Sequence, residues 1–109
     1  MKLTFLYQPV EDLLAAVAFH RDELELEEAW REGDDTVAFW FPDRSAQIML
    51  SITQQPAGAM YLVDDLDTWI SDHPNVVTSI AKYEIPGGAV AGFSAPGSNT
   101  FYVFDQPTA

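Results

Sequence analysis

Two short stretches of the chain repeat one local pattern, in which an apolar strand is followed by an acidic pair and then by a helix that opens on leucine. The stretches are Val10-Glu11-Asp12-Leu13 and Val63-Asp64-Asp65-Leu66, and they lie 53 positions apart in a chain of 109 residues. Asp12 and Asp65 are suited to be helix N-caps, because a short carboxylate accepts hydrogen bonds from the free N–H groups of a first helical turn. A repeat at half the chain length indicates two copies of one structural unit.

Sliding the sequence by 53 positions without a gap aligns seven identical residues. The identical pairs are Val10 with Val63, Asp12 with Asp65, Leu13 with Leu66, His20 with His73, Val37 with Val90, Ala38 with Ala91, and Ser45 with Ser98. Aromatic residues follow the same register, so that Trp40 corresponds to Phe93. Because the matches occur in order and in one register, we expect the two halves to be copies of one unit.

Hydrophobic periodicity and turn residues predict the same order of elements in both halves, namely a strand, a helix and three further strands. In the first half we expect strands at 3–7, 24–27, 36–41 and 46–52, and a helix from 13 to about 21. In the second half we expect strands at 59–63, 76–80, 89–93 and 100–104, and a helix from 66 to 73. The predicted fold class is α+β, with two βαβββ modules at about 1–53 and 57–106 in a single domain of residues 1–109.

The chain is strongly acidic, with 17 acidic residues against five basic ones and a formal net charge of −12. Nucleic acid and anionic membrane surfaces are recognised by basic patches, so we expect neither as a partner. The sequence contains no cysteine, which excludes disulfides, thiolate metal sites and thiol catalysis. It shows no apolar run near the roughly 18 residues of a membrane span and no signal-peptide pattern, so we expect a cytoplasmic protein.

The two histidines, His20 and His73, occupy matching positions near the ends of the two predicted helices. A matched pair of imidazoles suggests a metal site or acid–base chemistry. At a helix C-terminus, however, a cation is stabilised by the negative end of the helix dipole. We therefore interpret both histidines as structural residues and assign no catalytic residue in this chain.

Four phrases, in their order and spacing, resemble the vicinal oxygen chelate superfamily, which includes glyoxalase I, the extradiol dioxygenases and the bleomycin-resistance proteins. The phrases are PVEDL at 9–13, AFHRD at 18–22, YLVDDLD at 61–67 and GFSAPGSN at 92–99. The resemblance implies two βαβββ repeats that form a curled mixed sheet, and a homodimer. The chain departs from the family pattern at Glu25, where a glycine usually follows the first helix.

The resemblance also identifies the positions that hold a metal in the metal-dependent branches, where each half contributes one ligand from its first strand and one from its last. The matching residues here are Phe5 and Met49 in the first half, and Gly58 and Tyr102 in the second. A divalent ion prefers imidazole or carboxylate ligands, and among these four residues only Tyr102 offers an oxygen. The resemblance therefore implies a member without the metal centre, and we expect no metal and no other cofactor.

If the first and last strands of each half turn these residues inward, the former metal site becomes an aromatic and thioether pocket. The expected ligand-binding residues are Phe5, Tyr7, Trp40, Gln47, Met49, Met60, Phe93 and Tyr102. Such a lining suits a flat or apolar small molecule, which tyrosine hydroxyls and Gln47 would orient. Two alternatives stay open, because these side chains would equally fill a closed core, and Trp40 and Phe93 would equally serve as symmetric core residues.

Three functional readings follow from this lining. The first is a metal-free protein that binds a small apolar or aromatic molecule, in the cup of the sheet or in the cleft of a homodimer, without catalysing a reaction. The second is a metal-independent or diverged enzyme of the lyase, isomerase or dioxygenase type, which would use Tyr7 or Tyr102 for acid–base chemistry. The third is a structural module with a filled cup. Resemblance of fold does not choose among them, and we favour binding.

Overall fold

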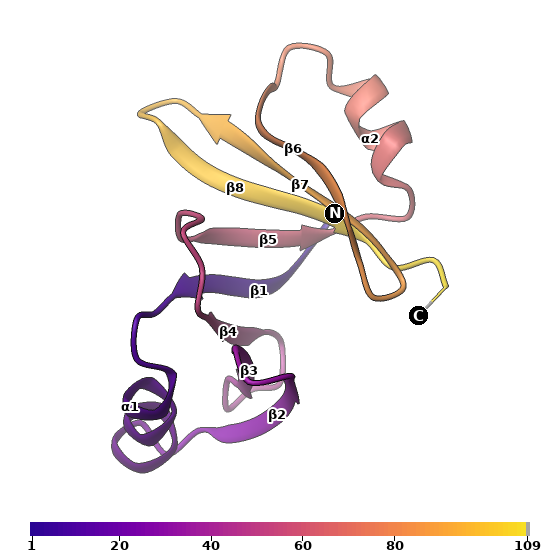
Figure 1. Cartoon of the computed structure of the whole chain (residues 1–109). Coiled ribbons are helices and arrows are strands. Elements are labelled where there is room, and N and C mark those ends of the chain that lie inside the picture. The colour runs from indigo at the N-terminus through magenta and orange to yellow at the C-terminus, as the bar shows by residue number, and fades with distance from the viewer. Residues whose placement is uncertain (109) are drawn as a thin grey trace. The chain divides into compact units, whose positions relative to one another are not determined.

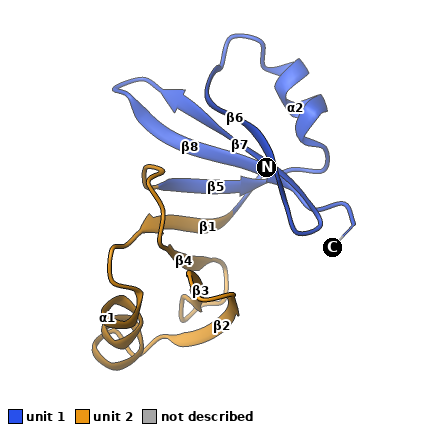
Figure 2. Cartoon of the chain, viewed as in Figure 1, with its two compact units in different colours: residues 1–3, 58–109 blue, residues 4–57 orange. Residues whose placement is uncertain are grey.

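In the computed structural model, which describes residues 1–108, the chain divides into two units (Figure 2). Unit 2 contains residues 4–57, and unit 1 contains residues 1–3 together with the chain from residue 58 onward. The order of the elements confirms the predicted α+β fold of two βαβββ repeats (Figure 1). Within the described residues, no helix is long and apolar enough to cross a membrane.

The strands of unit 2 form a mixed sheet in the order β2-β3-β4-β1. Strand β1 runs parallel to β4, whereas β3 is antiparallel to both β2 and β4. The elements are β1 (Lys2–Pro9), α1 (Leu13–Ala18), the π-helical turn η1 (Phe19–Glu23), β2 (Glu27–Glu32), β3 (Thr36–Trp40) and β4 (Gln47–Ser51). The first two residues of β1 belong to unit 1.

The strands of unit 1 repeat this arrangement in the order β5-β8-β7-β6. Strand β5 runs parallel to β8, and β7 is antiparallel to both β6 and β8. The elements are β5 (Gly58–Leu62), α2 (Leu66–Asp72), β6 (Val77–Ile85), β7 (Gly88–Ala95) and β8 (Asn99–Asp105). The same pairing in both units is the structural counterpart of the sequence repeat.

Both helices begin where the repeated acidic pairs predict. Asp12 Oδ1 accepts a hydrogen bond from the backbone N–H of Ala15 at 3.0 Å, and Asp65 Oδ1 accepts one from that of Thr68 at 2.9 Å. The hydrogen bond from the Thr68 backbone holds the pKa of Asp65 below its ordinary value, because it stabilises the charged carboxylate. The two N-caps therefore fix equivalent starting points for α1 and α2.

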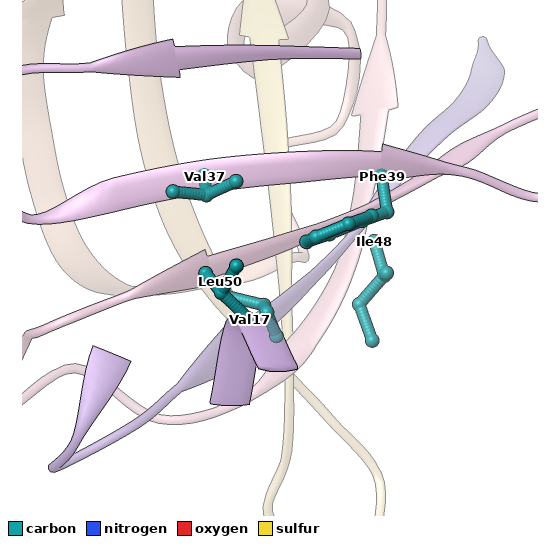
Figure 3. Packing of buried hydrophobic residues seen from close by; sticks show 5 residues of the cluster. All are labelled: Val17, Val37, Phe39, Ile48 and Leu50. Carbon is teal, nitrogen blue, oxygen red and sulfur yellow. The ribbon is translucent and has the colours of Figure 1, made fainter. Parts of the chain in front are cut away.

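Each helix covers one face of the sheet in its own unit with an apolar cluster. In unit 2 the cluster joins a residue of α1 to two residues each of β3 and β4, as Figure 3 shows. Its buried members are Val17, Val37, Phe39, Ile48 and Leu50. The buried members of the unit 1 cluster are Leu66, Ala91, Phe93 and Val103. Because side chains alternate along a strand, the residues between these members point to the other face of each sheet.

The predicted one-to-one register between the halves is wrong for one strand. Counted between paired residues, the β3–β4 connection is one residue longer than the β7–β8 connection. A shift of one position moves every side chain of a strand to the opposite face. Trp40 therefore corresponds to Ser94 and not to Phe93, and Phe93 corresponds to Phe39, which lies under α1 in the unit 2 cluster.

Strand β2 begins later than the predicted strand at 24–27. The helical segment continues through η1 to Glu23, and the backbone N–H of Leu24 still donates to the carbonyl of Phe19 at 3.1 Å. The strand then begins at Glu27. The alternation of leucine and glutamate in this stretch belongs to the chain that leaves the helix, and it does not mark a strand.

Glu25, at the family's usual glycine position, has a φ angle of +57°. A left-handed backbone costs an L-residue with a side chain roughly 1–2 kcal/mol, and glycine adopts it without that cost. We expect Glu25→Gly to raise the free energy of unfolding by about 1 kcal/mol, measured by urea denaturation. The matched control is Glu84→Gly inside β6, which we expect to lower stability by about 0.5–1 kcal/mol. A destabilised Glu25→Gly variant would contradict this assignment of strain.

Candidate functional site

The face of the unit 2 sheet opposite α1 carries most of the predicted ligand-binding residues. Phe5 pairs with Gln47, which pairs in turn with Trp40, and directly paired residues point to one face. The next row consists of Tyr7, Met49 and Ala38. We call this surface the aromatic face and define it by Phe5, Tyr7, Trp30, Trp40, Gln47 and Met49.

Trp30 is a member of the aromatic face that the sequence analysis missed. It pairs with Ala38 across β2 and β3, next to a register irregularity in β2. Its indole Nε1–H donates a hydrogen bond to Gln47 Oε1 at 2.8 Å, and its ring meets that of Phe5 edge to face, with 6.0 Å between the centroids. The signal that would have found it is a strand centred on residue 30, which the early placement of β2 concealed.

Trp40 lies at the edge of the aromatic face, beside the β3–β4 turn. The guanidinium carbon of Arg44 lies 5.4 Å from the centre of the Trp40 ring, within the range of a cation–π interaction. Arg44 also forms an ion pair with Glu27 of β2. These contacts connect the turn to β2 and hold the indole ring in place at the rim of the sheet.

The aromatic face combines side chains that solvent reaches with side chains that it does not. Tyr7 and Gln47 are only 9% and 8% exposed, whereas Phe5, Trp40 and Met49 are half-buried. Gln47 satisfies its amide oxygen with Trp30, so a buried polar group has a partner. The arrangement is an accessible apolar surface around an amide and an indole of defined orientation.

The corresponding face of unit 1 is packed. Met60 and Tyr102 form a register pair there, with 5% and 0% of their surfaces exposed. Gly92 pairs with Tyr102, and a Cβ added to Gly92 would lie 2.8 Å from Ile80 Cδ1. Ile80 therefore occupies the space above Gly92. This burial is what the filled-core alternative predicts for Met60 and Tyr102.

Phe93 lies on the other face, in the cluster under α2. It is 1% exposed, and its ring centroid lies 5.2 Å from that of Trp69 and 5.5 Å from that of Phe101. The structure does not bring Phe93 together with Met60 and Tyr102. The shift in the β7 register explains why the sequence placed it with Trp40.

The two histidines have the same local role in the two units. His20 Nδ1 lies 2.8 Å from the carbonyl oxygen of Ala16, and His73 Nδ1 lies 2.6 Å from that of Trp69. In both cases the ring is hydrogen-bonded four residues back along its helix, where carbonyls lose their helical partners. These contacts agree with the structural reading of His20 and His73.

Solved structures share this arrangement of elements. A methylmalonyl-CoA epimerase from Mycobacterium tuberculosis has a TM-score of 0.69 at 18% identity, covering 95% of this chain and 87% of that one. A glyoxalase/bleomycin resistance protein/dioxygenase superfamily member from Vibrio splendidus 12B01 has a TM-score of 0.65 at 14% identity, covering 93% and 95%. The chain has the vicinal oxygen chelate fold.

The likeness establishes the fold and leaves the activity open. A protein from Legionella pneumophila described as an NAD-dependent benzaldehyde dehydrogenase has a TM-score of 0.75 at 10% identity, covering 94% of this chain and 97% of that one. Proteins with different described activities therefore share one vicinal oxygen chelate fold. No protein-family model matches the chain, and no curated protein matches it.

The residues at the metal positions of the vicinal oxygen chelate fold do not fit a divalent metal. Unit 2 offers the phenyl ring of Phe5 and the thioether of Met49, which are not ligands for a hard ion. Unit 1 offers Gly58 and the buried Tyr102. A Cβ at Gly58 would lie 2.4 Å from the backbone oxygen of Thr100, so the backbone there leaves no room for a ligating side chain. Within the described residues, no group of three or more histidines and carboxylates is placed to hold a metal.

The hydrogen bond between Trp30 and Gln47 is the polar centre of the aromatic face. We expect Trp30→Phe and Gln47→Met each to lower the free energy of unfolding by about 1–3 kcal/mol, because each leaves a polar group without its partner. A double-mutant cycle should give a coupling energy of about 1 kcal/mol. Trp30→Phe combined with Ser51→Ala, four positions along β4, should be additive within about 0.5 kcal/mol. Additivity in the Trp30–Gln47 cycle would show that the bond contributes nothing.

Proposed function

We propose that the chain is a glyoxalase/bleomycin-resistance-like protein without a metal centre, which binds a small apolar or aromatic molecule on the aromatic face of unit 2. The observation that carries the proposal is the side-chain set at that face. Half-buried Phe5, Trp40 and Met49 surround Gln47, whose orientation is set by Trp30. Binding sites for small molecules are mainly apolar, with a few polar groups that fix orientation.

The chemistry of the aromatic face supports a flat ligand. Indole and phenyl rings bind planar molecules by stacking or edge-to-face contact, and a thioether adapts its shape to an apolar surface. Gln47 is only 8% exposed and its amide oxygen accepts from Trp30, so it would act on the ligand by orienting that indole and not by direct contact. A strongly anionic ligand is disfavoured, because the chain carries a net charge of −12.

A second candidate function is a structural or interaction module. The observation that favours it is the packing of the unit 1 face, where Tyr102 is 0% and Met60 5% exposed. We therefore restrict the proposed binding site to unit 2 and treat Met60, Tyr102 and Phe93 as core residues. The enzyme alternative has less support, because an acid–base group must reach its substrate, and Tyr7 and Tyr102 are both buried.

Binding can be measured with N-phenyl-1-naphthylamine, a neutral aromatic probe whose emission rises in apolar surroundings. We expect saturable binding to the wild-type chain. Met49→Asp should weaken it at least about tenfold, which corresponds to about 1.4 kcal/mol, because it places a charge among apolar groups. Met49→Gln, which adds polarity without charge, should cause a smaller loss.

The matched control for this titration is Leu6→Asp. Leu6 lies between Phe5 and Tyr7 on β1, so its side chain points to the opposite face, and it is 40% exposed. We expect this variant to bind the probe like the wild type. Equal losses in Leu6→Asp and Met49→Asp, or no saturable binding of the probe and of a panel of planar aromatic compounds, would refute the aromatic face as a site.

The absence of a metal centre can be tested separately. We expect elemental analysis of the purified protein to find far less than one ion of nickel, zinc, iron, manganese or cobalt per chain. The same result should follow incubation with each ion and gel filtration, because the four metal positions supply one oxygen ligand at most. Near-stoichiometric metal at a saturable site would contradict the proposal.

A further inference from the structure

Helix α1 and the first residue of η1 carry exposed apolar side chains on the side that faces away from the sheet of unit 2. Leu14 is 84% exposed and Phe19 51%. Ala15 is also exposed and Ala18 is half-buried. We call this surface the α1 outer face and define it by Leu14, Ala15, Ala18 and Phe19. An exposed group of apolar residues on one element is a common mark of an interaction site.

The fold itself does not require this surface. Residues Leu13, Ala16 and Val17 already form the inward stripe of α1 and pack on the unit 2 cluster. In a helix, positions 14, 15 and 18 lie on the opposite side from that stripe. Figure 3 shows Val17 among the buried residues of β3 and β4. The residues of the α1 outer face therefore contribute little to the core of unit 2.

Helix α2 provides an internal comparison, because both helices start at equivalent N-caps. The inward residues of α2 are apolar and match those of α1, namely Leu66, Trp69 and Ile70. The outward residues differ in kind at every position. Leu14, Ala15, Ala18 and Phe19 of the first helix correspond to Asp67, Thr68, Ser71 and Asp72 of the second. The same element thus folds in unit 1 with a polar outer face, and the apolar face of α1 needs another explanation.

The turn η1 holds part of this surface in place. The ring of His20 stacks on Phe39 of the core with 5.9 Å between centroids, and Phe19 meets the same imidazole edge to face at 5.4 Å. His20 is also hydrogen-bonded to the carbonyl of Ala16. One side of the Phe19 ring therefore packs on His20, while half of its surface stays exposed. A side chain ordered in this way loses little conformational entropy when a partner covers it.

The negative charge around the α1 outer face favours a partner with positively charged residues. Five acidic residues and one basic residue lie between positions 11 and 25, which gives a net charge of −4. They are Glu11, Asp12, Asp22, Glu23 and Glu25, against Arg21. Arg21 forms an ion pair with Asp22 at 2.8 Å, so its charge is locally balanced. If a second copy of the chain docked here through its own α1 outer face, two sets of acidic residues would meet. Repulsion between these like charges opposes that contact.

We propose that the α1 outer face docks an amphipathic helix of a partner protein, whose apolar stripe is flanked by lysine or arginine. Leucine-type side chains at helical spacing would cover Leu14 and Phe19, and the flanking cations would face the acidic residues around them. A standard interface between two globular proteins uses roughly 20–30 residues a side. Four apolar residues between positions 14 and 19 match a single helix better than a whole domain.

The test uses a fluorescein-labelled 18-residue peptide of leucine and lysine, patterned as an amphipathic helix, and measures its binding by fluorescence anisotropy. We expect the wild-type chain to bind it, and Leu14→Asp to bind at least tenfold more weakly. Phe19→Asp, a second variant, should show a similar loss. Both changes install the residue that α2 has at that position, and Leu14 is 84% exposed, so the fold should tolerate the first.

Each of these variants adds a negative charge, which separates docking from simple charge attraction. If the peptide recognised only the acidity of the chain, Leu14→Asp would bind it as tightly as the wild type or more tightly. The matched control is Val77→Asp in β6, where the side chain is 64% exposed, and it should bind within twofold of the wild type. A peptide with glutamate in place of lysine should not bind.

Three results would overturn the proposal. The first is equal peptide affinity for the wild type, Leu14→Asp and Val77→Asp. The second is a wild-type dimer in sedimentation experiments that Leu14→Asp dissociates, since the occupant would then be a second copy. The third is binding to neutral phosphatidylcholine vesicles that Leu14→Asp abolishes, since the surface would then be a membrane contact.

Discussion

The alternation of side chains along β4 is the constraint on which the rest of unit 2 depends. Ile48 and Leu50 point toward α1 and pack with Val17, while Gln47 and Met49 point the other way. A slip of one residue would exchange the two sets, so that an amide and a thioether would lie under the helix. The pairing of β4 with both β1 and β3 carries the same choice of face to Phe5 on one side and to Trp40 on the other. The core and the aromatic face are therefore two results of one register.

Much of this arrangement could be predicted from the sequence, because local chemistry sets it. Asp12 and Asp65 fix both helix starts through short-range hydrogen bonds. A carboxylate followed by an apolar helical stripe can be recognised in any sequence. Strand parity predicted that Phe5 and Tyr7 share one face, and that Gln47 and Met49 share another. The structure shows that these two faces are one, because β1 pairs in parallel with β4 and brings Phe5 beside Gln47 and Tyr7 beside Met49.

The remaining features depend on connection lengths, helix ends and strand irregularities, which hydrophobic periodicity does not reveal. The face on which Phe93 lies depends on one extra residue in the β3–β4 connection. A comparison of the two halves without gaps cannot detect that extra residue. Trp30 was missed because a π-helical turn extends the helix to Glu23 and delays the following strand. Tyr102 is buried beside Gly92, and the space above Gly92 is filled by Ile80, which comes from a strand with its own register irregularities. Insertions and bulges change the face of a side chain without changing the periodicity on either side of them.

The duplication also separates what the fold needs from what this chain adds. Wherever the two units agree, as in the N-caps, the inward helical stripe and the histidines hydrogen-bonded four residues back, the shared feature is explained by the folding of one module. Where the two units differ, the same backbone arrangement forms with either residue at the matched position. Stability alone therefore does not require one residue or the other. Leu14 against Asp67 and half-buried Met49 against buried Tyr102 are differences of this kind. Both place accessible apolar side chains in unit 2 where the matching position of unit 1 is polar or buried, so both proposed sites lie in residues 4–57.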